Sequence, residues 1–259
     1  EFWLDLDAVG SPDNWNGRLW LGALYQDGAP NRVLELKILE TCETLPEGAI
    51  ANKVFPLKGG KTAVSKKIIK LPFVKKAIKL DGKLDEAEWT DALEFRELTR
   101  LSSPGIEAPP TKFQMLRDDK NLYIAAELTP VGENGFQYDE LLRPWYCDSI
   151  EVYLQCRDAE EAFVQYIIAT NRKTYAMHKV SKQAGATSKP LSVPEYKAAE
   201  MNGKWCLEMK IPLAVLGTGA DRSGFNLCRS VWDCGNAIPY TLAPGREFRN
   251  MEAFELDWK

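Results

Sequence analysis

The residues most suited to chemistry lie in the stretch PWYCDSIEVYL, residues 144–154, where two carboxylates follow an aromatic pair. Glycosidases use paired carboxylates about 5 to 10 Å apart, which makes Asp148 and Glu151 a candidate pair. However, positions three apart on a strand point to opposite faces, so these two side chains are poorly placed to act on one substrate. The pattern therefore favours a non-catalytic role, in which Trp145 either binds a ligand or caps the end of a β-sandwich.

Other catalytic signatures are absent from the sequence, which has no GxSxG, HExxH, P-loop or dinucleotide-binding fingerprint. The single histidine, His178, excludes most histidine-based metal sites, and we expect it in a surface strand or loop. The six cysteines lack the paired CxxC spacing of zinc sites, and either one or two disulfides or six free thiols would fit them. They are Cys42, Cys147, Cys156, Cys206, Cys228 and Cys234. A free-standing enzyme is not expected.

Composition limits the possible partners. The 33 Lys and Arg residues stand against 37 Asp and Glu, a formal charge of −4, so no basic field is expected to attract nucleic acid. The longest apolar runs, such as residues 166–169, are far shorter than the roughly 20 residues of a membrane span. An apolar content of 45% is enough for real cores. The chain begins at Glu1 without an initiator Met, so we expect a mature or excised piece of a larger protein.

Residues 1–74 are expected to form a small N-terminal antiparallel β unit. Strand-like runs at 2–8, 18–25, 33–39 and 62–71 alternate with turn clusters rich in Gly, Pro, Asp and Asn, which adopt the backbone angles that reverse a chain. Pro72 ends the last run because proline cannot donate a hydrogen bond to a neighbouring strand. We therefore place the domain boundary near residue 74.

Residues 75–259 show many short strands and no long segment with a helical period. Hairpin signals such as Asn202-Gly203 separate the strands. The strand candidates are 112–117, 122–129, 149–155, 163–170, 174–179, 195–200, 204–211, 225–232 and 253–258. Strands at this spacing predict an all-β fold, an antiparallel β-sandwich.

The segment 81–89 predicts a turn followed by a short helical turn. Asp81 and Gly82 end a strand, and Asp85 is expected to cap the helical turn by accepting its unpaired backbone N–H groups. Trp89 would then point inward as an anchor. Trp205, at the start of a later strand, is also expected in the core.

Four separated motifs occur in this region: IKLDGKLDEAEW (78–89), DDKNLYIA (118–125), WYCDSIEVYL (145–154) and WCLEMKIPL (205–213), the last followed by GFNLCR (224–229). In their order and spacing they resemble the family 9 carbohydrate-binding modules, over about residues 75–259. The resemblance implies a β-sandwich that binds a poly- or oligosaccharide without catalysis.

The resemblance also implies a binding site. Family members hold the sugar between two aromatic rings, which Trp145 and Phe248 match here, and a carboxylate matched by Glu151 accepts hydroxyl hydrogen bonds. Aromatic rings suit this task because one face of a pyranose is apolar while its edges carry hydroxyls. As alternatives, Trp145 caps a loop and Glu151 is a solvated strand carboxylate.

Two departures from the family pattern concern polar contacts. An arginine and an asparagine of the family are matched here by Ile167 and, approximately, Gly245. The site therefore either holds a different glycan or has lost binding. Trp232 could line the same end of the sandwich. The polar residues that could substitute are Gln165, Asn171 and Arg229.

The family further implies structural calcium and an extracellular setting. Asp81, Asp85 and Glu86 are candidate calcium ligands, since carboxylate oxygens suit this hard cation, but DGxxDE is equally a turn followed by a helix cap. The module is expected to be secreted or at the cell surface, and to raise the local concentration of an attached glycan-degrading catalytic domain on its polymer.

Two other functions are compatible with the sequence. Some electron-transfer subunits of bacterial dehydrogenases share the scaffold and ligate haem through side chains such as Met and Lys. Met177 with Lys179, or Met209 with Lys210, could serve, although methionine also fills gaps in cores. Alternatively, the sandwich is a structural or partner-binding module that positions a neighbouring domain and binds no sugar.

Overall fold

A computed structural model describes residues 18–23, 32–37, 66–101, 103–131, 135–136, 138–181, 187–233, 236–243, 248–251 and 253–259. The chain divides into two compact units, Glu1–Ala63 and Val64–Lys259. In the first unit, β1 (Arg18–Ala23) and β2 (Arg32–Lys37) form an antiparallel pair close to the predicted runs at 18–25 and 33–39. The strand predicted at 2–8 lies outside the described residues.

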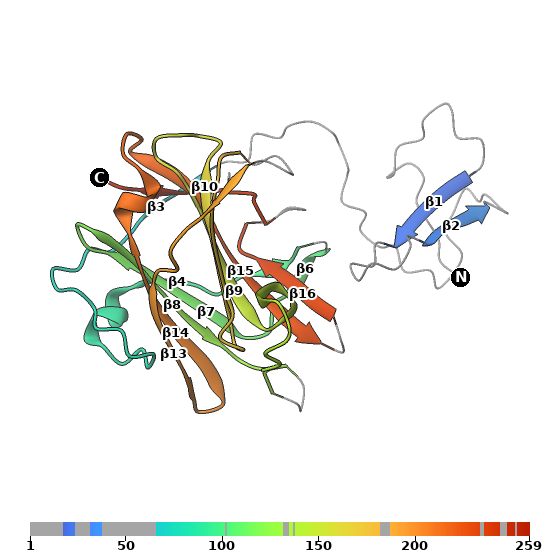
Figure 1. The fold of residues 1–259 in the computed structure, drawn as a ribbon, viewed down its shortest axis with the longest axis horizontal. Helices are drawn as coiled ribbons and strands as arrows, with labels where there is room; N and C mark the ends of the chain where they lie inside the picture. Colours follow the sequence, from blue (N-terminus) through green and yellow to red (C-terminus); the bar gives the residue numbers. More distant parts are fainter. Residues whose placement is uncertain are drawn as a thin grey trace, which may run out of the picture. The chain divides into compact units, whose positions relative to one another are not determined.

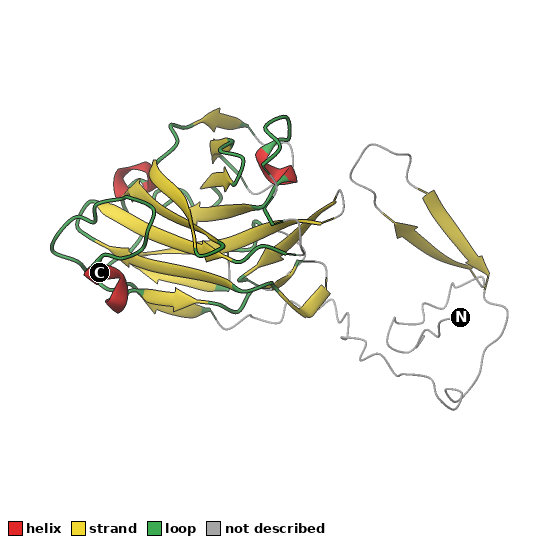
Figure 2. Cartoon of the chain, turned by 90° about the horizontal axis from the view of Figure 1, so that it is seen from below, coloured by secondary structure: helices red, strands yellow, loops and turns green. Residues whose placement is uncertain are grey.

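The second unit is a β-sandwich, as predicted, and its two sheets are seen in Figures 1 and 2. The larger sheet has the strand order β12-β11-β10-β9-β15-β16-β5-β6, and β17 pairs with both β15 and β3. Its strands are β3 (Lys67–Lys70), β5 (Thr99–Arg100), β6 (Ser103–Glu107), β9 (Ser149–Gln155), β10 (Phe163–Ala169), β11 (Thr174–Lys179), β12 (Ser188–Pro190), β15 (Arg222–Asp233), β16 (Asn236–Thr241) and β17 (Phe254–Asp257).

The smaller sheet has the strand order β13-β14-β8-β7-β4. Its strands are β4 (Leu93–Phe95), β7 (Thr111–Arg117), β8 (Asn121–Leu128), β13 (Glu195–Met201) and β14 (Lys204–Pro212). The short 3-10 helices are η1 (Ala87–Asp91), η2 (Pro144–Tyr146) and η3 (Leu213–Leu216). Among the described strands, all pairings are antiparallel except that of β17 with β3.

The main core lies between the two sheets, and strand alternation decides which residues enter it. On β9, Ile150, Val152 and Leu154 are fully buried in this core. Their neighbours Glu151 and Tyr153 point to the opposite side, because successive side chains on a strand alternate. We call that side of the larger sheet, turned away from the core, the outer face.

A second apolar cluster covers the other side of the smaller sheet. Trp89 on η1 is 3% exposed and packs there with Leu80 and Tyr123, while Trp205 is buried in the main core, so both tryptophans are core residues as predicted. The predicted cap is wrong: Glu86, not Asp85, occupies the N-cap position of η1, and it makes no side-chain cap hydrogen bond.

The structure places β3 within the second unit, whereas the sequence assigned the run 62–71 to the first. Ile69 of β3 pairs with Leu256 of β17, and Ile69 and Leu71 are buried in the main core. Residues 67–71 of the run are therefore part of the sandwich, because β3 pairs with β17 and buries Ile69 and Leu71 in the main core.

No helix among the described residues has the length and apolar character to cross a membrane. Four cysteines of the described part are free and buried, so it contains no disulfide; they are Cys147, Cys156, Cys206 and Cys228. Cys42 and Cys234 lie outside it. His178 lies on β11, partly buried, with its Nε2 3.5 Å from the Sγ of Cys156.

Candidate functional site

A buried polar group occupies the middle of the outer face. Glu151 is only 2% exposed, and its Oε2 accepts hydrogen bonds from the Tyr153 hydroxyl at 2.7 Å and from Gln165 Nε2 at 3.3 Å. Gln165 Nε2 also donates to the Tyr153 hydroxyl oxygen at 2.9 Å. Burial raises the pKa of Glu151, and hydrogen bonds from Tyr153, Gln165 and Ser230 oppose that rise. Glu151 is therefore a buried acceptor and not a solvated strand carboxylate.

Phe248 lies over this group. Its ring stacks on Tyr153 with centroids 6.2 Å apart and 14° between the planes, and it packs against a cluster that includes Phe163 and Met251. The backbone carbonyl of Phe248 accepts a 2.8 Å hydrogen bond from Asn226 Nδ2. One face of the Phe248 ring is thus occupied by the protein itself.

Trp145 lies at the entrance to β9, on η2, which packs against β10, β15 and β16. Its ring is edge-on to Tyr175, with centroids 5.7 Å apart at 89°, and to Tyr146, at 6.1 Å and 63°. The guanidinium carbon of Arg143 lies 5.6 Å from the centroid of the Trp145 ring. Trp145 is partly exposed, so it is available to a ligand at the edge of the outer face.

The strand register shows which residues of β9, β10 and β11 share the outer face. Ile167 on β10 pairs with Glu151 on one side and with Tyr175 on β11 on the other, so these three share the outer face. Two inter-strand spacings, about 10 Å, separate Tyr175 from the strand that carries Glu151 and Tyr153. Ile167 is 2% exposed and fills the position where the family pattern has an arginine. Gly245 lies outside the described residues.

Asn171 positions the loop that leads to Trp145. Its Nδ2 donates to the carbonyls of Asp139 at 2.8 Å and Leu142 at 3.1 Å, and its Oδ1 accepts the N–H of Lys173 at 3.1 Å. Asn171 is 4% exposed, and these bonds use both its donor and its acceptor groups. The structure therefore places it behind the loop.

Arg229 and Trp232 lie on opposite faces of β15. Arg229 is fully buried and points to the core side, where Nη1 donates to Pro110 O at 3.2 Å and Thr111 Oγ1 at 2.7 Å, and Nη2 donates to Thr129 O. It joins the two sheets and lies apart from Glu151. Trp232, partly exposed, alternates onto the outer face beyond Ser230.

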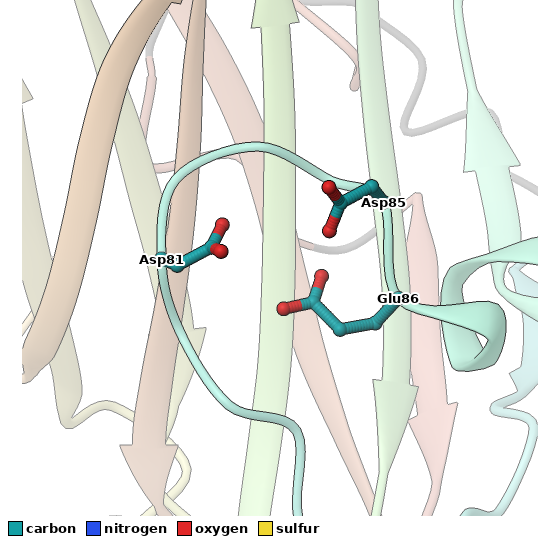
Figure 3. Close-up of side chains that lie close together, drawn as sticks. All are labelled: Asp81, Asp85 and Glu86. Atoms are coloured by element: carbon teal, nitrogen blue, oxygen red, sulfur yellow. The ribbon is translucent and has the colours of Figure 1, made fainter.

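The candidate metal ligands do converge. The carboxylates of Asp81, Asp85 and Glu86 point toward one another (Figure 3), and one oxygen from each lies within 4.8 Å of the others. Burial, together with the neighbouring Glu208 and Asp81 carboxylates, raises the pKa of Glu86 to about 7. Among the described residues, the buried Oε2 of Glu86 has no hydrogen-bond partner. This arrangement of hard oxygens fits a cation such as calcium.

Glu208 holds the turn that carries these carboxylates. It is fully buried, its Oε2 accepts the N–H groups of Asp81 at 2.7 Å and Gly82 at 2.6 Å, and its Oε1 accepts Trp89 Nε1 at 2.8 Å. Gly82 has φ +87, and a Cβ there would meet the backbone of Ala198 at 3.0 Å. The turn is therefore fixed closely against β13.

A model of the family described as carbohydrate family 9 binding domain-like matches residues 80–237, more than half of the chain. The chain belongs to this family. Modules of family 9 bind carbohydrate without catalysis, in agreement with the expectation that this chain is not an enzyme. No curated protein sequence matches it.

Solved structures support the fold of the family 9 domain. A family 9 carbohydrate-binding module from Caldicellulosiruptor kristjanssonii in complex with cellotriose has a TM-score of 0.53 at 16% identity, covering 74% of this chain and 93% of that chain. The complex of such a module with glucose has a TM-score of 0.55 at 17% identity, covering 74% of this chain and 96% of that chain. A protein from Bacteroides uniformis described as carbohydrate-binding has a TM-score of 0.56 at 10% identity, covering 75% of this chain and 100% of that chain.

Of the two Met–Lys pairs considered as haem ligands, one is not arranged to bind a haem iron. Met209 is fully buried in the main core, while Lys210, its neighbour on β14, forms an ion pair with Glu195. The two side chains point to opposite faces and cannot ligate one iron together. Met177 and Lys179 share the outer face of β11, beside Tyr175.

Sequence reasoning missed three residues beside the site of the family 9 domain: Tyr153, Tyr175 and Arg143. Strand alternation could have found Tyr153, which is two positions from Glu151. Tyr175 required the register of β10 with β11, which a single sequence does not specify. Arg143 could have been noticed only from its place two residues before Trp145.

Proposed function

We propose that the family 9 domain binds a carbohydrate on the outer face of the larger sheet, with Trp145 as the principal stacking ring and Phe248 as the second. One observation carries the proposal. The partly exposed Trp145 ring contacts Tyr175, which shares the outer face with the buried Glu151–Tyr153–Gln165 group. The apolar face of a pyranose packs on a ring while its hydroxyls need polar partners, so this arrangement supports the proposal.

In this proposal Glu151 acts together with Gln165. Both donated hydrogen bonds of Gln165 go inward, to Glu151 and to Tyr153, and within the described residues its Oε1 receives no donor. Gln165 is partly exposed, so this carbonyl oxygen is the group that a sugar hydroxyl reaches first. Glu151 fixes the orientation of the amide, which is why its burial is compatible with a role in binding.

The wider role rests on the family. The related modules of known structure hold cellotriose and glucose, so a glucan is the first ligand to test. We propose that the domain is a secreted or cell-surface ancillary module that tethers an attached glycan-degrading domain to its polymer. Tethering raises the effective concentration of a linked domain without any new catalytic group.

We also propose that Asp81, Asp85 and Glu86 hold a structural calcium ion. The support is the convergence of three carboxylates and the buried Glu86 oxygen that has no hydrogen-bond partner in the described part of the chain. Calcium would supply positive charge that offsets the repulsion among these groups and Glu208, and so stabilise the turn at residues 81–86.

Calorimetric titration with cellotriose and with glucose tests the binding proposal. Trp145→Ala should weaken binding by about 1–3 kcal/mol, which is roughly 5- to 150-fold, because a stacking ring is lost. Phe73→Ala is the matched control, since Phe73 is an exposed aromatic residue, 48% accessible, that packs with Arg117 away from the outer face. Binding that is equally strong in wild type and Trp145→Ala would place the sugar elsewhere. If no sugar binds, a structural or partner-binding role is favoured instead.

A further inference from the structure

Strand β11 presents Tyr175, Met177 and Lys179 on the outer face. Tyr175 and Lys179 lie four positions apart on this strand, and Lys173 precedes it, opposite Ala169 of β10. Because side chains at every second position share a face, Lys173, Tyr175 and Lys179 all belong to the side on which Trp145 lies. Arg143 comes from the loop before η2.

Both rings at this edge of the sheet are already associated with cations. The guanidinium of Arg143 lies 5.6 Å from the Trp145 ring centroid, and the ammonium of Lys179 lies 5.8 Å from that of Tyr175. These distances are in the range of cation–π contacts, which hold a positive charge close to an aromatic face. We call Trp145, Tyr175, Arg143, Lys173 and Lys179 the cationic corner.

Within the described residues, none of Arg143, Lys173 and Lys179 forms an ion pair with a carboxylate. Of the acids on neighbouring segments, Glu151 and Asp148 are each 2% exposed, whereas Asp139 and Glu140 are exposed in the loop before η2. Asp139, in the loop before η2, accepts the N–H of Leu141.

This lack of ion pairs in the described part of the chain does not follow from composition, because the whole chain carries a formal charge of −4. Randomly placed cations on such a surface would be expected beside acids. A guanidinium and two ammonium groups beside two aromatic rings instead match an anionic ligand with an apolar ring face. The charge-assisted hydrogen bonds that such groups donate to carboxylate or sulfate oxygens are stronger than those to a neutral hydroxyl.

We propose that the cationic corner makes this domain selective for an acidic saccharide, one that carries a carboxylate or a sulfate ester. The inference rests on the proposed function and names its substrate class. The pyranose ring stacks on Trp145 beside Tyr175, and the acidic groups of neighbouring sugar units are bound by Arg143, Lys173 and Lys179. Both acidic groups offer the same chemistry, a delocalised anion with several acceptor oxygens, and they are separated by experiment.

The test is calorimetry of the full chain with matched oligosaccharides that differ only in charge. De-esterified oligogalacturonide is compared with its fully methyl-esterified form, and a sulfated galactan oligosaccharide with its desulfated form. We expect at least one acidic member to bind about 10-fold or more tightly than its neutral counterpart. We also expect that preference to weaken as salt rises, because the Debye length shortens from about 10 Å at 0.1 M to about 3 Å at 1 M.

Two charge-neutralising variants locate the effect. Lys173→Gln and Lys179→Gln should each lower affinity for the preferred acidic ligand several-fold and leave affinity for its neutral counterpart unchanged. Lys197→Gln, which removes one positive charge from an exposed position on β13 in the other sheet, is the control and should change neither. The dependence on Lys179 and not on Lys197 distinguishes a specific contact from a general charge effect.

The outcomes separate this inference from the proposed function. Equal affinity for the charged and neutral members of both pairs overturns selectivity, while binding that still requires Trp145 keeps carbohydrate binding intact. A preference for the acidic member that survives both Lys173→Gln and Lys179→Gln also overturns the inference. If the acidic, neutral and glucan ligands all fail to bind, both proposals fall together. Preference for the uronate or for the sulfate identifies the acidic group.

Discussion

The ring of Phe248 lies nearly parallel to the ring of Tyr153, and the stacked pair shields the carboxylate to which Tyr153 donates its hydroxyl proton. Water is thereby kept from Glu151 on the outer side of the sheet, and the core excludes it on the other. The ionisation of one glutamate therefore reports on the packing of the candidate sugar site.

Glu151 should make the stability of the domain depend on pH. Burial raises its pKa, so the folded state binds the proton more tightly than the unfolded state. This contribution to stability is complete below the unfolded-state pKa and is lost as pH rises through the folded-state pKa. Urea unfolding from about pH 4 to about pH 9 should show Glu151→Gln gaining stability relative to wild type as pH rises. The groups that face Glu151 are Tyr153, Gln165, Ser230 and Cys228. A stability difference between Glu151→Gln and wild type that does not change with pH would contradict the raised pKa of Glu151.

Replacing Asn171 should loosen the loop that carries Trp145. Asn171→Ala removes two hydrogen bonds to the carbonyls of Asp139 and Leu142, which should cost about 1–3 kcal/mol of unfolding free energy. Amide hydrogen exchange in residues 139–146 should accelerate, and sugar affinity should fall although no stacking ring is removed. Asn121→Ala, at a turn where the side-chain amide bonds to Asp118, is the control and should leave that exchange unchanged. Unchanged exchange in Asn171→Ala would assign the residue another role.

Arg229 should matter for stability and not for binding. It donates to the carbonyls of Pro109, Pro110 and Thr129 and to the Thr111 hydroxyl, so Arg229→Met leaves several buried acceptors without a donor. We expect a loss of about 3 kcal/mol or more in chemical unfolding. Arg229→Lys should be intermediate, since an ammonium lacks the planar fork of donors. Reduced sugar affinity in a variant of wild-type stability would instead make Arg229 a ligand.

Removing calcium should lower the melting temperature. At calcium 100-fold above its Kd, binding to the folded state alone contributes about 2.7 kcal/mol, roughly 5 to 10 °C for a domain of this size. A chelator should abolish this in wild type and have no effect on Glu86→Gln or Asp85→Asn. Asp91→Asn, an exposed acid on η1 outside the carboxylate group, should keep the full response. A melting temperature that changes with neither calcium nor chelator would show that these carboxylates form only a turn.

Much of the sandwich was predictable because alternation is a local property. The runs at 149–155 and 174–179 match β9 and β11 to the residue, and the Asn202-Gly203 hairpin has the positive φ angles that its sequence favours. β16 was missed because Pro239 within it argues against a strand. In the structure the proline carbonyl accepts the N–H of Leu101, so the segment is stabilised by a contact that local pattern does not reveal.

The candidate site was less predictable because its members are joined by register. Trp145, Glu151 and Phe248 could be named from motif resemblance, but their neighbours could not. Whether Glu151 is solvated or buried depends on what covers the outer face. Phe248, which packs over Tyr153 there, lies about 100 residues further along the chain, so local sequence does not reveal the contact. Similarly, Arg229 and Asn171 are polar residues of the expected types whose side chains the fold directs to backbone carbonyls.

The parallel pairing of β3 with β17 has a consequence for synthesis on the ribosome. Ile69 cannot meet its partner Leu256 until the next 187 residues (256 − 69 = 187) have been translated, which at about 5–20 residues per second takes roughly 10 to 40 s. During that interval β3, whose Ile69 is buried in the folded domain, lacks its partner strand β17. The sandwich must therefore mature late, and chaperones that shield apolar nascent segments would act first on residues 67–71.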